Sequence, residues 1–104
     1  MINQNSFDIM IHGYRLMRTC GACPEQYDVL DSQENVVAYL RLRHGSYTVS
    51  VPDVGGKVIY QAFPQGDGFF DDDERVKYLE ESIKNIQRYY INREWVRDEQ
   101  NTHV

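Results

Sequence analysis

The fold is decided by residues 36–51, which read VVAYLRLRHGSYTVSV. Apolar and polar side chains alternate on both sides of the dipeptide His44-Gly45, and a period of two is typical of strands with one buried face. The apolar side chains of the first strand are Ala38, Leu40 and Leu42, and the polar ones are Tyr39, Arg41 and Arg43. The stretch therefore predicts an antiparallel hairpin with a tight turn at 44–46.

Further strands are predicted on both sides of this hairpin. The same alternation marks residues 7–12, which continue as 14–18 past a bulge at Gly13, and it returns at 26–30 and 57–63. Short turns rich in Gly, Pro, Asp and Asn separate these runs. The strands are therefore expected to pair in sequence order, as an antiparallel meander of about five strands.

An amphipathic helix is predicted after the last strand. Asp71 is a suitable N-cap, and Glu74 stands three residues later, as in a capping box. One apolar stripe with spacings of three and four follows; it consists of Val76, Leu79, Ile83, Ile86 and Tyr90. The expected fold is α+β, with one long C-terminal helix packed on one face of the meander, in a single domain at 1–98 with a frayed tail at 99–104.

Composition disfavours several classes of function. The chain has 104 residues, a net charge of -5 and a hydrophobic share of 41%, which suit one modest core. The acidic balance makes non-specific binding to duplex DNA unexpected, since such binding depends on Lys and Arg releasing counterions. No apolar run approaches the roughly 20 residues that span a bilayer, so no membrane partner is expected. Two cysteines and no export signal favour a cytoplasmic location.

The meander is expected to bring distant residues to one end of the sheet. Successive strands run in opposite directions, so alternate connections lie at the same end. The connections at 20–24, 44–46 and 65–73 should therefore meet, together with Arg18 and Arg43 at the ends of their strands.

These considerations predict a ligand-binding set, which consists of Arg18, Tyr39, Arg41, Arg43 and His44. Arginine presents a fork of donors to phosphate oxygens, and tyrosine offers a ring on which a base can stack. The expected partner is a protein or a small anionic ligand such as a nucleotide. The alternative is an exposed strand face whose arginines pair with Asp28, Glu34 or the acidic loop, at about 0–1 kcal/mol for each pair.

Cys20 and Cys23 have the CxxC spacing of a metal knuckle or a redox pair. A structural zinc site takes four ligands, and within one chain only His44 and Glu25 are candidates to join the thiolates. A homodimer would instead pool two cysteine pairs. A thioredoxin-like motif would begin a helix, whereas this one lies between two strands. The alternatives are a plain turn with packed thiols, a zinc site and a redox pair, and no cofactor other than zinc is expected.

Catalytic motifs are scarce. Neither Gly-x-Ser-x-Gly nor His-Glu-x-x-His occurs in the chain. His12 lies on the polar register of its strand, His103 lies in the tail, and paired carboxylates occur only at the acidic helix start, where solvent keeps them ionised. An enzyme is therefore not the favoured interpretation.

Three linked stretches resemble a group of short proteins from bacteriophages and prophage-like elements. They are RTCGACPEQYDV at 18–29, YLRLRHG at 39–45 and GDGFFDDDER at 66–75. The resemblance implies a context and no particular activity. In that context small proteins bind and block, for example as inhibitors of host defence or as binders of nucleotide signals.

A second similarity concerns residues 47–53 and the helix after them. HicB-type antitoxins also pass from a strand ending in Pro-Asp through Gly-rich turns into an amphipathic helix, although the strand at 57–63 departs from that pattern. The favoured interpretation is a non-enzymatic phage or mobile-element accessory protein that binds a ligand or a protein partner. The alternatives are a metal-stabilised module using Cys20 and Cys23, or a HicB-like antitoxin.

Overall fold

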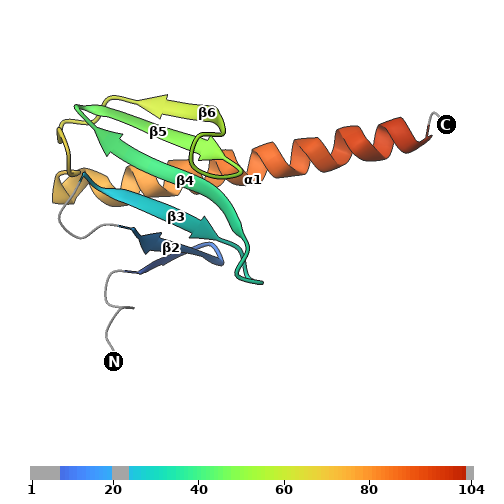
Figure 1. Cartoon of the computed structure of the whole chain (residues 1–104), viewed down its shortest axis with the longest axis horizontal. Helices are drawn as coiled ribbons and strands as arrows, with labels where there is room; N and C mark the ends of the chain where they lie inside the picture. Colours follow the sequence, from blue (N-terminus) through green and yellow to red (C-terminus); the bar gives the residue numbers. More distant parts are fainter. Residues whose placement is uncertain (1–7, 20–23, 103–104) are drawn as a thin grey trace.

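The computed structural model describes residues 8–19 and 24–102, with side chains described as far as residue 93. Within these ranges six antiparallel strands form one sheet in sequence order, and one long helix follows them (Figure 1). The elements are β1 (Ile9–Ile11), β2 (Tyr14–Arg18), β3 (Gln26–Leu30), β4 (Val36–Arg43), β5 (Ser46–Val51), β6 (Lys57–Ala62) and α1 (Asp72–Thr102). The predicted α+β meander with a C-terminal helix is confirmed.

The sheet has one strand more than predicted, because the first segment forms a hairpin. β1 pairs with β2 in the antiparallel sense, with Ile11 opposite Tyr14. His12 and Gly13 lie between the two strands and have φ angles of 52° and 85°. Positive φ at both central residues defines a two-residue type I′ turn. The predicted bulge at Gly13 is therefore wrong, and the glycine instead allows the chain to reverse.

The core lies between one face of the sheet and α1. Strands β2 to β5 contribute Leu16, Tyr27, Val29, Ala38, Leu40, Leu42, Tyr47, Val49 and Val51, all at most 2% exposed. The helix contributes Leu79, Ile83 and Ile86, each at most 1% exposed. Full burial of one such side chain stabilises the fold by about 1.5–3 kcal/mol, so this contact holds α1 on the sheet.

Polar contacts fix the helix across the sheet as well. The hydroxyl of Tyr47 in β5 is hydrogen-bonded to that of the buried Ser82 in α1. Farther along the helix, the hydroxyl of Tyr90 donates to the carbonyl of Val37 at 2.6 Å. Beyond this contact α1 extends past the sheet and ends at Thr102, within the segment 99–104 that was predicted as a frayed tail (Figure 1).

The start of α1 has one half of the predicted capping box, because the N–H of Glu74 donates to the backbone carbonyl of Asp71 and not to its side chain. The Glu74 carboxylate accepts a hydrogen bond from the backbone N–H of Asp71 at 3.0 Å. It also accepts from the N–H groups of Gln65 and Gly66, which fastens the preceding loop to the first turn. The predicted stripe begins one turn later than expected, because Val76 is 62% exposed. The residue of the first turn that faces the sheet is Arg75, whose partner is the buried Glu25.

Three connections meet at one end of the sheet, as the meander topology predicts. The N–H of Glu25, before β3, donates to the carbonyl of Gly68 in the β6–α1 loop at 2.7 Å. The N–H of Gly45, in the β4–β5 turn, donates to the carbonyl of Asp67 in the same loop, also at 2.7 Å. Segments more than 20 residues apart in the chain are thus joined through their backbones.

Candidate functional site: the open face of the sheet

The helix covers one face of the sheet and leaves the other uncovered in the part of the chain that the structure describes (Figure 1). We call the uncovered surface the open face. Strand alternation and register place on it Met10, Arg15, Met17, Gln26, Asp28, Leu30, Tyr39, Arg41, Arg43, Thr48, Ser50, Val58 and Gln61. Three of the five predicted ligand-binding residues therefore share this face, at every second position of β4.

Arg41 and Arg43 carry charges that no carboxylate neutralises among the described residues. Neither arginine takes part in an ion pair, and the buried Nε of Arg41 has no hydrogen-bond acceptor there. Arg15, at the far corner of the sheet, is different, because it pairs with Asp8 at 3.0 Å and with Glu34 at 3.1 Å. The alternative prediction was an exposed strand face whose arginines pair with carboxylates. Such pairs are found at Arg15, and none is found at Arg41 or Arg43 among the described residues.

Asp28 and Tyr39 lie side by side on the open face. They are partners in the β3–β4 register, and the Tyr39 hydroxyl donates to Oε1 of Gln26 at 3.0 Å. Burial raises the pKa of Tyr39; the charge of Arg41 opposes that effect and the charge of Asp28 adds to it. Burial, and after it the charge of Asp53, also raises the pKa of Asp28. Tyr39 therefore has a carboxylate beside it on β3 and a guanidinium group two residues along β4.

The structure places Arg18 on the opposite face from the rest of the predicted set. Arg18 is the register partner of the core residue Tyr27, so its side chain lies on the helix side of the sheet. Its guanidinium carbon is 5.9 Å from the centroid of the Tyr27 ring and 5.5 Å from that of Phe69. These are cation–π distances, and they join β2 to the β6–α1 loop.

His44 lies in the β4–β5 turn beside Arg43 and is exposed. Its φ of 53° and that of Gly45, 76°, form a second type I′ turn. His44 therefore lies at the edge of the open face, next to Arg43.

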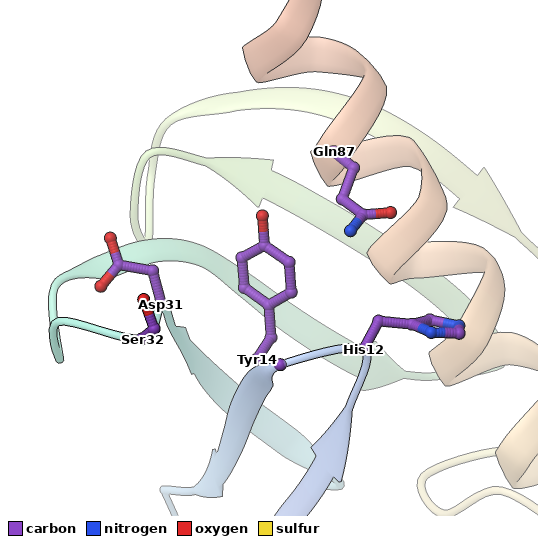
Figure 2. A pocket seen from close by; sticks show the side chains of 6 residues that line it. His12, Tyr14, Asp31, Ser32 and Gln87 are labelled. Atoms are coloured by element: carbon purple, nitrogen blue, oxygen red, sulfur yellow. The ribbon is translucent and has the colours of Figure 1, made fainter.

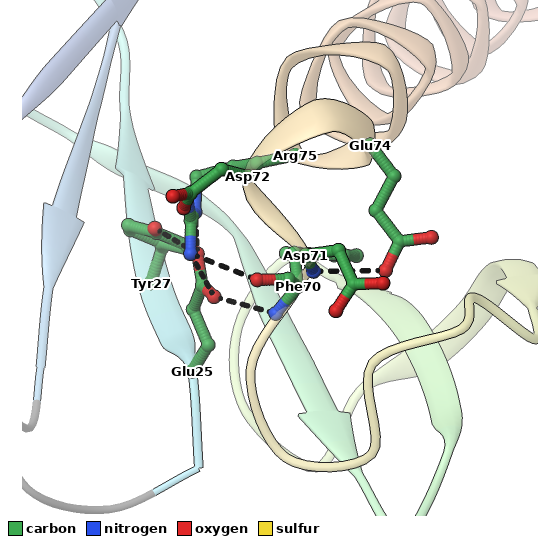
Figure 3. A network of polar contacts seen from close by, with 7 residues as sticks. All are labelled: Glu25, Tyr27, Phe70, Asp71, Asp72, Glu74 and Arg75. Atoms are coloured by element: carbon green, nitrogen blue, oxygen red, sulfur yellow. Dashed lines mark hydrogen bonds and ion pairs between the residues drawn. The ribbon is translucent and has the colours of Figure 1, made fainter.

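A buried ion pair fixes the end of the sheet at which the arginines lie (Figure 3). The Glu25 carboxylate, whose side chain is completely buried, accepts from Nε of Arg75 at 2.7 Å and from Nη2 at 3.2 Å. It also accepts from the Tyr27 hydroxyl at 2.5 Å and from the Phe70 N–H at 2.9 Å. We call these four residues the Glu25 clasp.

The Glu25 clasp also positions β4. Leu42 lies between Arg41 and Arg43 on β4, and its N–H donates a hydrogen bond to the backbone carbonyl of Glu25 at 2.9 Å. Burial by itself raises the pKa of Glu25, but hydrogen bonds from Arg75, Tyr27 and Phe70 together with the Arg75 charge outweigh it and hold the pKa below its ordinary value. Glu25 is thus an anion at neutral pH, and Arg75 supplies the matching charge.

Cys20 and Cys23 lie outside the described residues, so the zinc and redox hypotheses remain predictions from the sequence. Within the described residues no group of three or more His, Cys, Asp and Glu side chains is arranged to hold a metal ion. Among these residues no helix is long and apolar enough to cross a membrane.

A pocket of about 260 Å³ lies at the other end of the sheet (Figure 2). It is lined by residues of the β1–β2 turn, the β3–β4 turn and α1, which include His12, Tyr14, Asp31 and Gln87. The Asp31 carboxylate already accepts hydrogen bonds from the backbone of Gln33 and from Asn35. The charge of Asp31 therefore stabilises the turn. The residues that line the pocket include no pair of unpartnered charged side chains like Arg41 and Arg43.

Glu25, which the sequence predicts only as an additional zinc ligand, is central to the architecture. A signal for its burial is present, because Glu25, Tyr27 and Val29 share the inward register of one strand. A carboxylate at an inward position requires a cationic partner. That partner, Arg75, is 50 residues away and is identified only by the fold.

Comparison with known proteins gives no relative for this chain: no model of a protein family, no curated protein and no solved structure matches it. The conclusions about function below therefore rest on the geometry and charge of the described residues.

Proposed function

We propose that this chain is a non-enzymatic binding domain whose open face receives an anionic ligand or the anionic part of a partner. The observation that carries the proposal is the pair Arg41 and Arg43. They lie on one strand face, two residues apart, and no carboxylate pairs with either among the described residues.

The spacing of the pair suits a ligand with more than one anionic oxygen. Same-face residues of an extended strand lie roughly 6.8 Å apart, so the two long side chains can reach one phosphate group or two neighbouring ones. The register of the pair is fixed, because the Leu42 N–H between the arginines donates to the carbonyl of Glu25. Arginines on a fixed strand lose less freedom on binding than arginines on a mobile loop.

The resemblance to phage and prophage proteins supplies the proposed setting, a cytoplasmic accessory protein of a phage or mobile element. Such a protein acts by binding, as an inhibitor of a host defence protein or as a binder of a nucleotide signal. The net charge of -5 is consistent with a ligand that recognises one positive face, since the surface as a whole repels extended polyanions.

Arg41→Ala and Arg43→Ala are expected each to weaken the binding of inorganic pyrophosphate at least about fivefold, and together to abolish it. The loss should be greatest at low salt, because exposed charges are screened over roughly 10 Å at 0.1 M ionic strength. Isothermal titration calorimetry measures the affinity. Thermal unfolding should show stability within about 0.5 kcal/mol of the parent, since neither arginine has a described partner to lose.

Arg88→Ala is the matched control, because Arg88 is an exposed arginine on α1, away from the open face. It should leave pyrophosphate binding unchanged. Equal weakening by all three alanine variants would reduce the effect to net charge and contradict a site on the open face.

A further inference from the structure

The charged side chains of the open face are unevenly distributed along β4. Asp28 lies beside Tyr39 in register, and Arg41 and Arg43 follow Tyr39 at two and four residues along β4. At about 3.4 Å for each residue, Arg43 lies roughly 14 Å along the strand from the pair of Asp28 and Tyr39. A carboxylate and an aromatic ring thus lie side by side at one end of a short line, and the two unpaired guanidinium groups follow along β4 toward the other end.

Small and hydrogen-bonding side chains surround the Tyr39 ring. Its register partner on β5 is Ser50, and the next same-face pair along the two strands is Arg41 and Thr48. Its hydroxyl is fixed by Gln26. The ring is half-buried, and the Gln26 contact sets its orientation before any ligand binds.

The centre of the open face is unsuited to a typical protein interface. Such interfaces have an apolar, fully buried core with aliphatic or aromatic anchors. The central positions here are held by Gln26, Tyr39, Arg41, Thr48 and Ser50, whereas the apolar side chains Met10, Met17 and Val58 lie on the outer strands β1, β2 and β6. The chemistry favours a small polar ligand with a planar part and an anionic part.

We propose that the open face binds a nucleotide unit, with its base stacked on Tyr39 and its phosphate held by Arg41 and Arg43. The Asp28 carboxylate accepts a hydrogen bond from an amino group of the base, as carboxylates do from cytosine N4. Stacking on an aromatic side chain tolerates every base, so Asp28 supplies the preference. This inference rests on the proposed function and adds the class of ligand.

Four probes test it by calorimetry: CMP, UMP, a six-residue cytidine oligonucleotide and inorganic pyrophosphate. The parent protein should bind CMP more tightly than UMP, because UMP has no amino group to meet Asp28. Tyr39→Leu should weaken the binding of CMP about tenfold and leave the affinity for pyrophosphate unchanged. Tyr39→Phe keeps the ring and should therefore bind CMP as the parent protein does. Asp28→Asn should abolish the preference for CMP over UMP. The source of the unit follows from whether CMP or the oligonucleotide binds more tightly.

The outcomes separate this inference from the function on which it rests. If pyrophosphate binds through Arg41 and Arg43 but Tyr39→Leu leaves CMP unaffected, the nucleotide inference is overturned and anion binding stands. If no probe binds, or Arg41→Ala and Arg43→Ala change nothing, both are overturned. Tyr39→Phe guards against misfolding, since a loss of CMP binding in this variant as well would show that stacking is not the cause.

Discussion

Replacing Glu25 by alanine should lower the free energy of unfolding by about 3–5 kcal/mol, the loss typical when one partner of a buried ion pair is removed. The carboxylate is completely buried and accepts four hydrogen bonds. Without it, the N–H of Phe70 and the hydroxyl of Tyr27 lose a buried acceptor. The Arg75 side chain is 26% exposed and keeps Asp72 as a partner, so water relieves part of its cost.

Urea unfolding at neutral pH measures this effect, and Glu34→Ala is the matched control. Glu34 also pairs with an arginine, Arg15, but its side chain is 74% exposed. An exposed pair of this kind contributes about 0–1 kcal/mol, so the control should unfold nearly as the parent does. A loss below about 1 kcal/mol for Glu25→Ala would mean that the Glu25 clasp does not hold the end of the sheet.

Acid should unfold the parent protein more readily than a Glu25→Gln variant, relative to the stability of each at neutral pH. The pKa of Glu25 is lowered in the folded protein, so its contribution is fully present above the unfolded-state pKa, about 4.3 for a glutamate. The contribution is lost as the pH falls through the lower folded-state value. Glutamine has no proton to gain in this range, so its stability should depend less on pH.

The measurement is urea unfolding of both proteins at pH 7 and at about pH 3. Glu74 provides a second acid-sensitive group in both, because backbone hydrogen bonds from Asp71, Gln65 and Gly66 outweigh burial and lower its pKa. The difference between the two proteins therefore reports on Glu25 alone. Parallel loss of stability in parent and variant would show that Glu25 does not control the acid response.

The predictability of the fold depended on how unambiguous each local pattern was. Strand alternation across residues 36–51 correctly placed Leu40 inward and Arg41 outward, because only one register buries the aliphatic side chains. Gly13 was misinterpreted because a glycine within a strand pattern suits either a bulge or a reversal. The positive φ of its neighbour His12, which decides for the reversal, has no clear sequence signal.

The candidate site was predictable only along single strands. Tyr39, Arg41 and Arg43 were grouped correctly because they alternate on one strand. Arg18 was added from its place at the end of β2, although alternation from Leu16 already puts it on the helix side. The contact between Glu25 and Arg75 joins parts of the chain that only the tertiary structure brings together, so no local pattern predicts it.

The most direct test of an anion-binding open face is amide chemical-shift mapping of the isotope-labelled protein during titration with inorganic pyrophosphate. Shifts are expected to concentrate on β4 from Tyr39 to Arg43 and on Thr48 in β5, the register partner of Arg41. Shifts confined to the pocket near Tyr14 and Gln87, or no shifts at saturating pyrophosphate, would contradict it.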